Sequence, residues 1–132
     1  FLPRLKGKLG LFLALTGQRL RGADVYHAGI ATHFVHSDRL GDLQAALVQL
    51  KPPVTHADVD KTIRFFQPEE DVIPTFTLMG QMRHIQATFQ ADSVDGILAN
   101  LEREGSDWSL DTRKTLLAMS PTSLKLTFEQ LR

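Results

Sequence analysis

Hydrophobic residues recur along most of the chain at intervals of three and four, the period of amphipathic α-helices. The clearest stretches are 38–50, 76–89 and 93–103, in each of which large apolar residues mark one face. A further stretch, 8–16, is apolar on nearly every side, as is typical of a buried helix. The pattern therefore predicts a mainly α-helical protein with about seven helices.

Capping and breaking residues divide this pattern into elements. Ser37 is suited to begin the helix 38–50, and Pro52 and Pro53 end it, because proline cannot continue a helix. Thr55 and Asp58 have the spacing of a capping box, with Asp in place of the usual Glu, and begin a helix to about Phe66. The other predicted helices are 22–29, 107–119 and 121–131.

One segment favours a different conformation. Residues 30–35 are rich in β-branched and aromatic side chains, which favours a short strand or an extended segment. The predicted fold class is therefore mainly α, with at most one short strand near residues 30–35.

One position weakens a predicted helix. Within the helix 76–89, Gly80 lowers the helical preference by about 1 kcal/mol relative to Ala.

Composition and charge narrow the possible partners. The 132 residues are 42% hydrophobic and 23% charged, with 15 basic and 15 acidic side chains, so the formal net charge is zero. A neutral chain has no overall field to attract nucleic acid or an anionic membrane, and we expect neither as a partner. The longest apolar stretch, 9–15, is shorter than the ~20 residues of a membrane-spanning helix. The lack of cysteine excludes disulfides and thiolate nucleophiles.

The histidines are the first candidates for chemistry. His33 and His36 have a spacing that places two metal ligands together on a helix, but in an extended segment they point to opposite faces. No third ligand completes a metal signature around them, so we expect no metal site. His27 is predicted to be a surface or packing residue, and His84 has no visible partner on its helix.

The remaining candidates have structural explanations. Ser37, Ser93 and Ser120 stand where helices begin, which favours capping over nucleophilic catalysis. The acidic run 69–71 lies in a proline-bounded loop and is typical of a solvated charge run. The chain also has a local group of basic residues, Lys6, Lys8, Arg19 and Arg21. This group could attract a phosphorylated ligand, but the solvation of one helix face explains its positions equally well. The residues by themselves therefore show no complete catalytic constellation.

Four motifs nevertheless form a pattern that extends over both ends of the chain. They are Phe1-Leu2-Pro3-Arg4-Leu5, Leu15-Thr16-Gly17, Gly29-Ile30-Ala31-Thr32-His33-Phe34-Val35 and Met119-Ser120-Pro121-Thr122-Ser123-Leu124. With these motifs the chain resembles the hydrolase branch of the enoyl-CoA hydratase/isomerase (crotonase) superfamily, whose substrate is 3-hydroxyisobutyryl-CoA. The resemblance is weakest between residues 52 and 79.

The resemblance implies a fold and an activity. Members of this superfamily have a spiral β/α core followed by a helical C-terminal part, so residues 1–50 correspond to the end of the core and residues 51–132 to the helical region. They hold acyl-CoA with two backbone N–H groups around the thioester oxygen, and acidic residues act in its hydrolysis. By this pattern the acids and the oxyanion-hole glycines precede Phe1. We expect the chain to be a portion of a longer protein.

The resemblance also implies a limited set of site residues and partners. No residue of this chain matches a catalytic position of the family, and Phe1 and Leu2 are expected to flank the substrate pocket as part of its wall. No cofactor is implied, since coenzyme A is part of the acyl-CoA substrate. Self-association of identical subunits is possible within this pattern. The implied location is the mitochondrial matrix in a eukaryote and the cytoplasm in a bacterium.

Two alternatives remain open from the sequence. A hydratase or isomerase of the same superfamily shares the looser motifs, although the segment 31–35 and the helix start at Ser120 favour the hydrolase branch. The lack of catalytic groups also permits a non-catalytic helical interaction module. Such a module would present the apolar faces of 8–16 and 124–131 to a partner.

Overall fold

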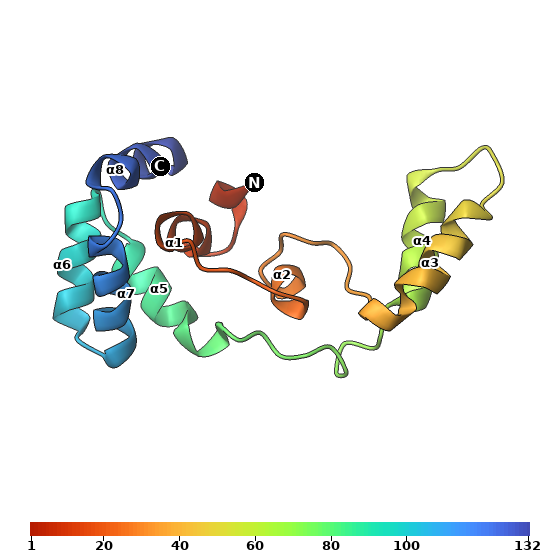
Figure 1. The fold of residues 1–132 in the computed structure, drawn as a ribbon, viewed down its shortest axis with the longest axis horizontal. Helices are drawn as coiled ribbons and strands as arrows, with labels where there is room; N and C mark the ends of the chain where they lie inside the picture. The colour runs from red at the N-terminus through yellow and green to blue at the C-terminus, as the bar shows by residue number, and fades with distance from the viewer.

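The computed structural model describes all residues 1–132, and these form helices and connecting segments without any strand (Figure 1). The predicted mainly α class is therefore confirmed. None of the helices has the length and hydropathy that a membrane span requires. The α-helices are α1 (Leu9–Thr16), α2 (Ala23–His27), α3 (Leu40–Val48), α4 (His56–Phe66), α5 (Met82–Phe89), α6 (Val94–Glu104), α7 (Asp107–Leu117) and α8 (Pro121–Leu131), and the short 3-10 helices are η1 (Leu2–Arg4), η2 (Ser37–Arg39) and η3 (Met79–Gln81).

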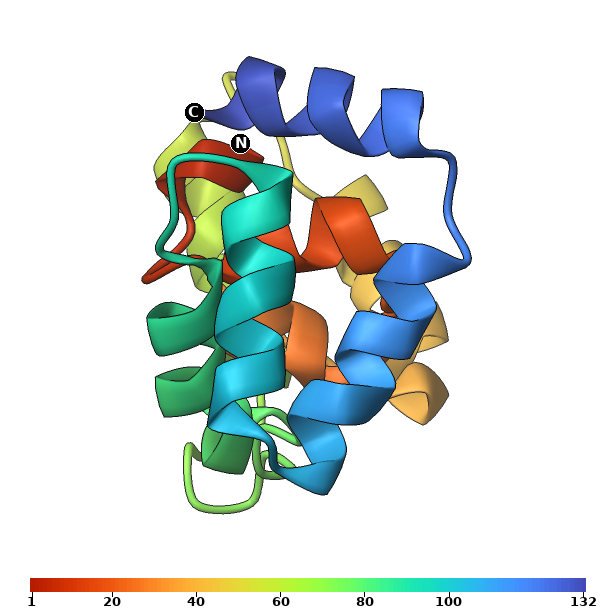
Figure 2. The ribbon, with the colours of Figure 1, turned by 90° about the vertical axis from the view of Figure 1, so that its left-hand side faces the viewer.

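Helices α1 and α5–α8 form the body of the molecule. Figure 2 shows α6 and α7 side by side, with α8 lying across their upper ends and α1 behind them. Because α1 is apolar on nearly every side, it is buried in this group, with Leu9 and Leu15 each 2% exposed. The most enclosed side chains around it come from the neighbouring helices: Ile85, Phe89, Ile97, Leu101 and Leu116.

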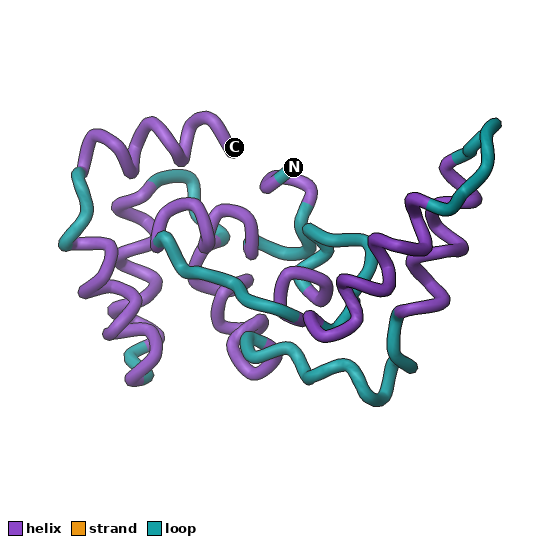
Figure 3. Tube along the Cα trace, turned by 45° about the vertical axis from the view of Figure 1, so that its right-hand side comes forward, coloured by secondary structure: helices purple, strands orange, loops and turns teal.

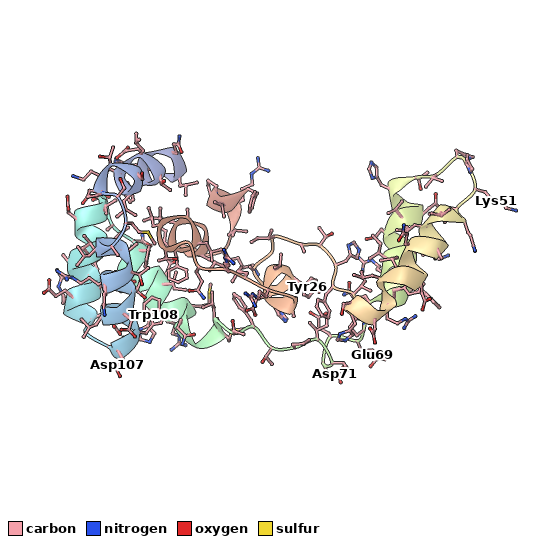
Figure 4. The ribbon with its side chains drawn as sticks, viewed as in Figure 1. Tyr26, Lys51, Glu69, Asp71, Asp107 and Trp108 are labelled. Atoms are coloured by element: carbon pink, nitrogen blue, oxygen red, sulfur yellow. The ribbon has the colours of Figure 1, made fainter.

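Residues 37–66 form an arm that projects from the body. In the arm, α3 and α4 pack against each other as a hairpin, and Lys51 lies at its tip (Figures 1 and 4). Neither helix contains a buried residue, and Val48 and Phe65 are each 79% exposed. The two helices therefore cover each other's apolar stripes but leave their outer faces open.

Two connections, 28–36 and 67–78, join the body to the arm, and Figure 3 shows them as the loop segments that lead to the arm and back from it. Polar contacts cross between them and their ends. The Asp24 carboxylate accepts from Thr77 N at 2.9 Å, His27 Nε2 lies 2.8 Å from Pro74 O, and Phe34 N donates to Gln67 Oε1 at 3.3 Å. We call these three contacts the connecting ladder.

The connecting ladder explains why residues 30–35 are not a strand. The segment is extended, as one of the two alternatives predicted, but its neighbour approaches through side chains and a proline carbonyl. Since a strand needs a continuous backbone ladder with a partner, the strand alternative is wrong.

Most predicted helix starts are confirmed. Thr55 and Asp58 form a reciprocal capping box, Ser93 accepts from Gly96 N at 3.0 Å, and Ser120 accepts from Ser123 N at 3.3 Å. Ser37 is the exception. The chain makes one 3-10 turn, η2, before α3, so Ser37 lies inside that turn and provides no capping bond.

The predicted helix 76–89 starts later than its hydrophobic spacing indicated. Regular helix begins at Met82, after the 3-10 turn η3 that contains Gly80. Phe76 and Leu78 are buried, but they lie in a turn. The backbone N–H of Thr77, between them, donates to the Asp24 carboxylate on α2 instead of to a helical carbonyl. The tertiary contact to Asp24 thus replaces the first turn of the predicted helix.

The boundary expected at residue 50 stays a prediction. In the structure, the arm runs across that position as one hairpin, with α3 before it and α4 after it.

Candidate functional site

The N-terminal segment, where Phe1 and Leu2 were expected to flank a substrate pocket, lies against α1 and α8. Leu2 packs against the hydrophobic core and lines a cavity of about 120 Å³ between η1, α1 and α8. Phe1 is 75% exposed and is not among the residues that line this cavity. The role of both as pocket wall stays a prediction.

Gly10 places this segment. A Cβ atom at Gly10 would lie 1.9 Å from the carbonyl oxygen of Leu2, which is far inside van der Waals contact. Only glycine therefore lets η1 rest directly on α1.

A larger groove of about 700 Å³ lies on the other side of the N-terminal segment, between it, α2 and α5. Its floor is apolar and includes Leu5, Leu9 and Phe76. Two cationic residues, Arg4 and Lys6, stand in its lining, which is completed by Tyr26, His27, Ala28, Gly29, Glu70, Met79 and Met82. The groove can accept an apolar chain, with cations available for an anionic group.

The polar groups of this groove are already engaged in holding the connections. His27 Nε2 lies 2.8 Å from Pro74 O, and because a carbonyl only accepts, this nitrogen carries the proton. The His27 ring also stacks on Phe76, with ring centroids 6.0 Å apart. Tyr26 donates its hydroxyl to the Glu70 carboxylate at 3.2 Å. The packing role predicted for His27 is confirmed.

His33 and His36 are not brought together as ligands. His33 Nε2 lies 2.7 Å from Asp60 Oδ1 on α4, whereas His36 packs edge-on against Phe34, with ring centroids 5.1 Å apart. Nowhere do three potential ligands among His, Asp and Glu gather as a metal site would require. Hydrogen bonds from Arg64, and then from His33, lower the pKa of Asp60 below its ordinary value.

His84 has a partner that its own helix did not reveal. Its Nδ1 lies 2.7 Å from Glu104 Oε1, at the C-terminal end of α6. The Ser106 hydroxyl and backbone N–H also donate to Glu104, and these bonds are the main reason why the pKa of Glu104 falls to about 2. Glu104 lies 20 positions further along the chain, on another helix, so residue spacing within α5 did not reveal this partner.

The charged runs are dispersed. Glu69 and Asp71 are exposed at a turn in the connection 67–78 (Figure 4). Between them, Glu70 accepts a hydrogen bond from the Tyr26 hydroxyl. Lys6 and Lys8 precede α1, and Arg19 and Arg21 follow it, so the buried helix separates the two pairs. The four basic residues therefore do not form one anion site.

Sequence reasoning missed the group formed by Thr32, His33 and Asp60. Thr32 Oγ1 lies 2.8 Å from His33 Nδ1, and the other ring nitrogen meets Asp60. The adjacent Thr-His pair was a visible signal. Asp60 comes from a helix 27 residues further along the chain, so its approach depends on the arm.

Comparisons with known proteins agree with this architecture. The chain is 49% identical over 133 residues to a mitochondrial 3-hydroxyisobutyryl-CoA hydrolase of Danio rerio, an alignment that covers 99% of this chain and 35% of the relative. The human enzyme of the same name is 47% identical over 133 residues, with 99% of this chain and 34% of the relative covered. The chain thus spans about a third of the length of these curated relatives.

A solved structure supports the same assignment. A carnitinyl-CoA dehydratase from Mycobacterium thermoresistibile superimposes with a TM-score of 0.82 and 29% sequence identity, over 99% of this chain and 36% of that one. The family model described as enoyl-CoA hydratase/isomerase matches residues 1–132. The match includes the arm, the connections and the body, and the chain therefore belongs to the enoyl-CoA hydratase/isomerase family.

Proposed function

We propose that this chain is the helical portion of an acyl-CoA thioester hydrolase that acts on 3-hydroxyisobutyryl-CoA, a step of valine breakdown. The observation that carries the proposal is the 49% identity, across 99% of the chain, to a relative named for that activity. The matched region covers 99% of the chain, so it includes the N-terminal segment, the connections and the terminal helix rather than one motif alone.

The proposed reaction is attack of water on the thioester carbonyl, with release of the coenzyme A thiol. The acids that move the proton and the backbone N–H groups that stabilise the oxyanion are proposed to precede Phe1 in the protein. In support, the histidine and the tyrosine that line the groove beside the N-terminal segment are engaged, His27 with Pro74 O and Tyr26 with Glu70. We therefore propose that the 132 residues alone do not turn over substrate.

The chain's own contribution is proposed to be shape and charge near the substrate. Phe1 and Leu2 would form wall residues, fixed through the contact of η1 with Gly10. The apolar groove with Arg4 and Lys6 suits the aliphatic arm and the phosphates of an acyl-CoA. No separate cofactor is required, because coenzyme A enters with the substrate.

A dehydratase or hydratase is the second candidate. It is favoured by the likeness of the fold to a carnitinyl-CoA dehydratase, although the 29% identity is lower than that to the hydrolases. The two activities are chemically distinct, since a hydrolase breaks the C–S bond and a hydratase adds water across a C=C bond.

The discriminating experiment supplies the full-length protein with 3-hydroxyisobutyryl-CoA and, separately, with crotonyl-CoA. The proposal expects thiol release from the first and little hydration of the second. Hydration of crotonyl-CoA without thiol release from either substrate would favour the second candidate instead.

Location and assembly follow from the same proposal. Several relatives are named as mitochondrial enzymes, so we propose the mitochondrial matrix if the source is eukaryotic. Self-association stays a prediction, and the mass of the full-length protein in solution tests it.

A further inference from the structure

Thr32, His33 and Asp60 form a hydrogen-bonded chain outside the groove. Thr32 Oγ1 lies 2.8 Å from His33 Nδ1, and His33 Nε2 lies 2.7 Å from Asp60 Oδ1. The other carboxylate oxygen of Asp60 accepts from Arg64 Nε at 2.7 Å. A hydroxyl, an imidazole and a carboxylate are thus joined by consecutive hydrogen bonds, and a guanidinium group binds the second oxygen of the carboxylate.

The partners determine where the imidazole proton resides. An ionised carboxylate only accepts hydrogen bonds, and the Arg64 guanidinium keeps Asp60 ionised. Nε2 of His33 therefore carries the proton, and in the neutral ring Nδ1 presents a lone pair to Thr32. The Thr32 hydroxyl donates to this lone pair, which is the arrangement in which a base activates a hydroxyl nucleophile.

Other threonine hydroxyls of the chain lack this arrangement. Thr55 Oγ1 donates directly to the Asp58 carboxylate at 2.7 Å, and Thr115 Oγ1 donates to the Asp111 carbonyl at 3.0 Å. Neither of these two hydroxyls contacts an imidazole. Thr32 is also exposed, and the ring that activates it is held at 17% side-chain exposure. The reactive group is accessible while its base is fixed.

We propose that Thr32 is a site of O-acylation by activated acyl donors, acyl thioesters above all. The Thr32 oxygen forms a bond to the acyl carbonyl carbon while His33 Nδ1 takes the hydroxyl proton. The C–S bond then breaks, and the thiolate leaves with the proton from Nδ1. The products are one threonine ester per chain and one free thiol, with no oxidation or reduction.

An aryl ester tests the site without relying on the proposed hydrolase activity. The full-length protein is incubated with p-nitrophenyl acetate, and acetylated residues are located by peptide mass spectrometry. We expect acetyl at Thr32 and none at Thr55, an exposed threonine of the arm that serves as an internal control. His33→Gln removes the base and is expected to lower the rate of Thr32 labelling about 100-fold.

A second pair of variants separates the nucleophile from the fold. Thr32→Val keeps the shape of the side chain without its hydroxyl and is expected to abolish the label, whereas Thr32→Ser retains it. Asp60 acts through His33 as a positioning residue. In Asp60→Asn the amide can donate to Nε2, which moves the ring proton to Nδ1, so labelling falls even where the melting temperature shows a folded protein.

Two results would overturn the proposal. One is folded wild-type protein that acquires no acetyl group at Thr32, or acquires it at the same rate as at Thr55. The other is Thr32 labelling in His33→Gln at the wild-type rate, which would show that exposure alone determines reactivity. If hydrolase activity fails but the label appears at Thr32, the site stands and only the proposed function is wrong.

Discussion

Single residues fix the backbone of this chain at points where helices approach one another. Gly10 allows the carbonyl of Leu2 to lie against α1, and Asp24 holds the turn that contains Thr77. Glu104 joins α5 to the start of α7 through His84 and Ser106. In each case one small or charged side chain determines a contact between elements that are distant in sequence.

Gly10→Ala is expected to lower the free energy of unfolding by about 1–3 kcal/mol, because the new methyl group must displace the backbone of η1. Gly80→Ala is the matched control, since nothing lies within 4 Å of the position that its new methyl group would take and its φ is not positive. Denaturant unfolding of the full-length variants measures both changes. Equal stability of the two variants would contradict the close approach of η1 to α1.

Because of Glu104, the free energy of unfolding is expected to decrease as the pH falls into the acid range. Its pKa falls from an ordinary 4.5 to about 2 in the folded chain, mainly through the bonds from Ser106. Because the folded pKa is lower than the unfolded one, the stabilisation is complete above about pH 4.5 and is lost as the pH falls toward 2.

The measurement compares wild type with Glu104→Gln in urea at several pH values. The difference in free energy of unfolding should be constant above about pH 5.5 and should narrow below the ordinary Glu value of 4.5. Glu69→Gln, at an exposed position in the connection 67–78, is the control. Its difference in free energy of unfolding from wild type should not narrow at low pH. A difference that stays the same down to pH 2 would mean that Glu104 is not held in these bonds.

The residue-scale contacts that could be predicted are those made within one turn of helix. The capping box of Thr55 and Asp58 joins residues three positions apart, so its chemistry is legible in the sequence. The bonds from Asp24 to Thr77 and from His84 to Glu104 join residues that are 53 and 20 positions apart. Their pairing depends on the fold, which residue spacing does not contain.

At the scale of elements, helices end where backbone conformation changes rather than where apolar residues run out. Gly17 ends α1 in the left-handed region at φ 69°, and Gly105 ends α6 at φ 72°. Gly41 lies within α3 in an ordinary helical conformation. Identical substitutions at Gly17 and Gly41 should therefore have opposite effects.

Gly17→Ala is expected to lower the free energy of unfolding by about 1–2 kcal/mol, because an alanine must adopt the left-handed region. Gly41→Ala is expected to raise it by about 0.5–1 kcal/mol through its better helical preference. No atom lies within 4 Å of the added methyl group at either position, so neither change includes a clash. Thermal unfolding of both variants measures the signs, and a shared sign would refute the assigned backbone conformations.

Periodicity located the helices but not all of their starts. The helix expected from residue 76 begins at Met82, because the Asp24 carboxylate and Gly80 favour a turn before it. Of the two conformations predicted for residues 30–35, the extended segment is confirmed and the short strand is wrong, since β propensity forms a strand only where a partner backbone is available. Both errors arise at the connecting ladder, where tertiary contacts outweigh local preference.

At the scale of the whole molecule, the chain divides into a body with a buried hydrophobic core and an arm whose helices contain no buried residue. The body packs α1 and α5–α8 around side chains such as Ile97 and Leu101, which are fully enclosed. The arm contains no buried residue and is held to the body by the connecting ladder. The sequence motifs indicated the family, but the projection of the arm depends on the crossing contacts of two connections.

The central proposal is that this chain shapes part of an acyl-CoA hydrolase whose catalytic groups precede Phe1. The most direct test is release of thiol from 3-hydroxyisobutyryl-CoA by the full-length protein and by two of its variants, His27→Gln and His84→Gln. The account predicts thiol release by all three, with kcat of the variants within about tenfold of wild type, whereas loss of a general base costs about 100-fold or more. Absence of thiol release by the wild type, or a loss of that larger size in the folded His27→Gln variant, would contradict it.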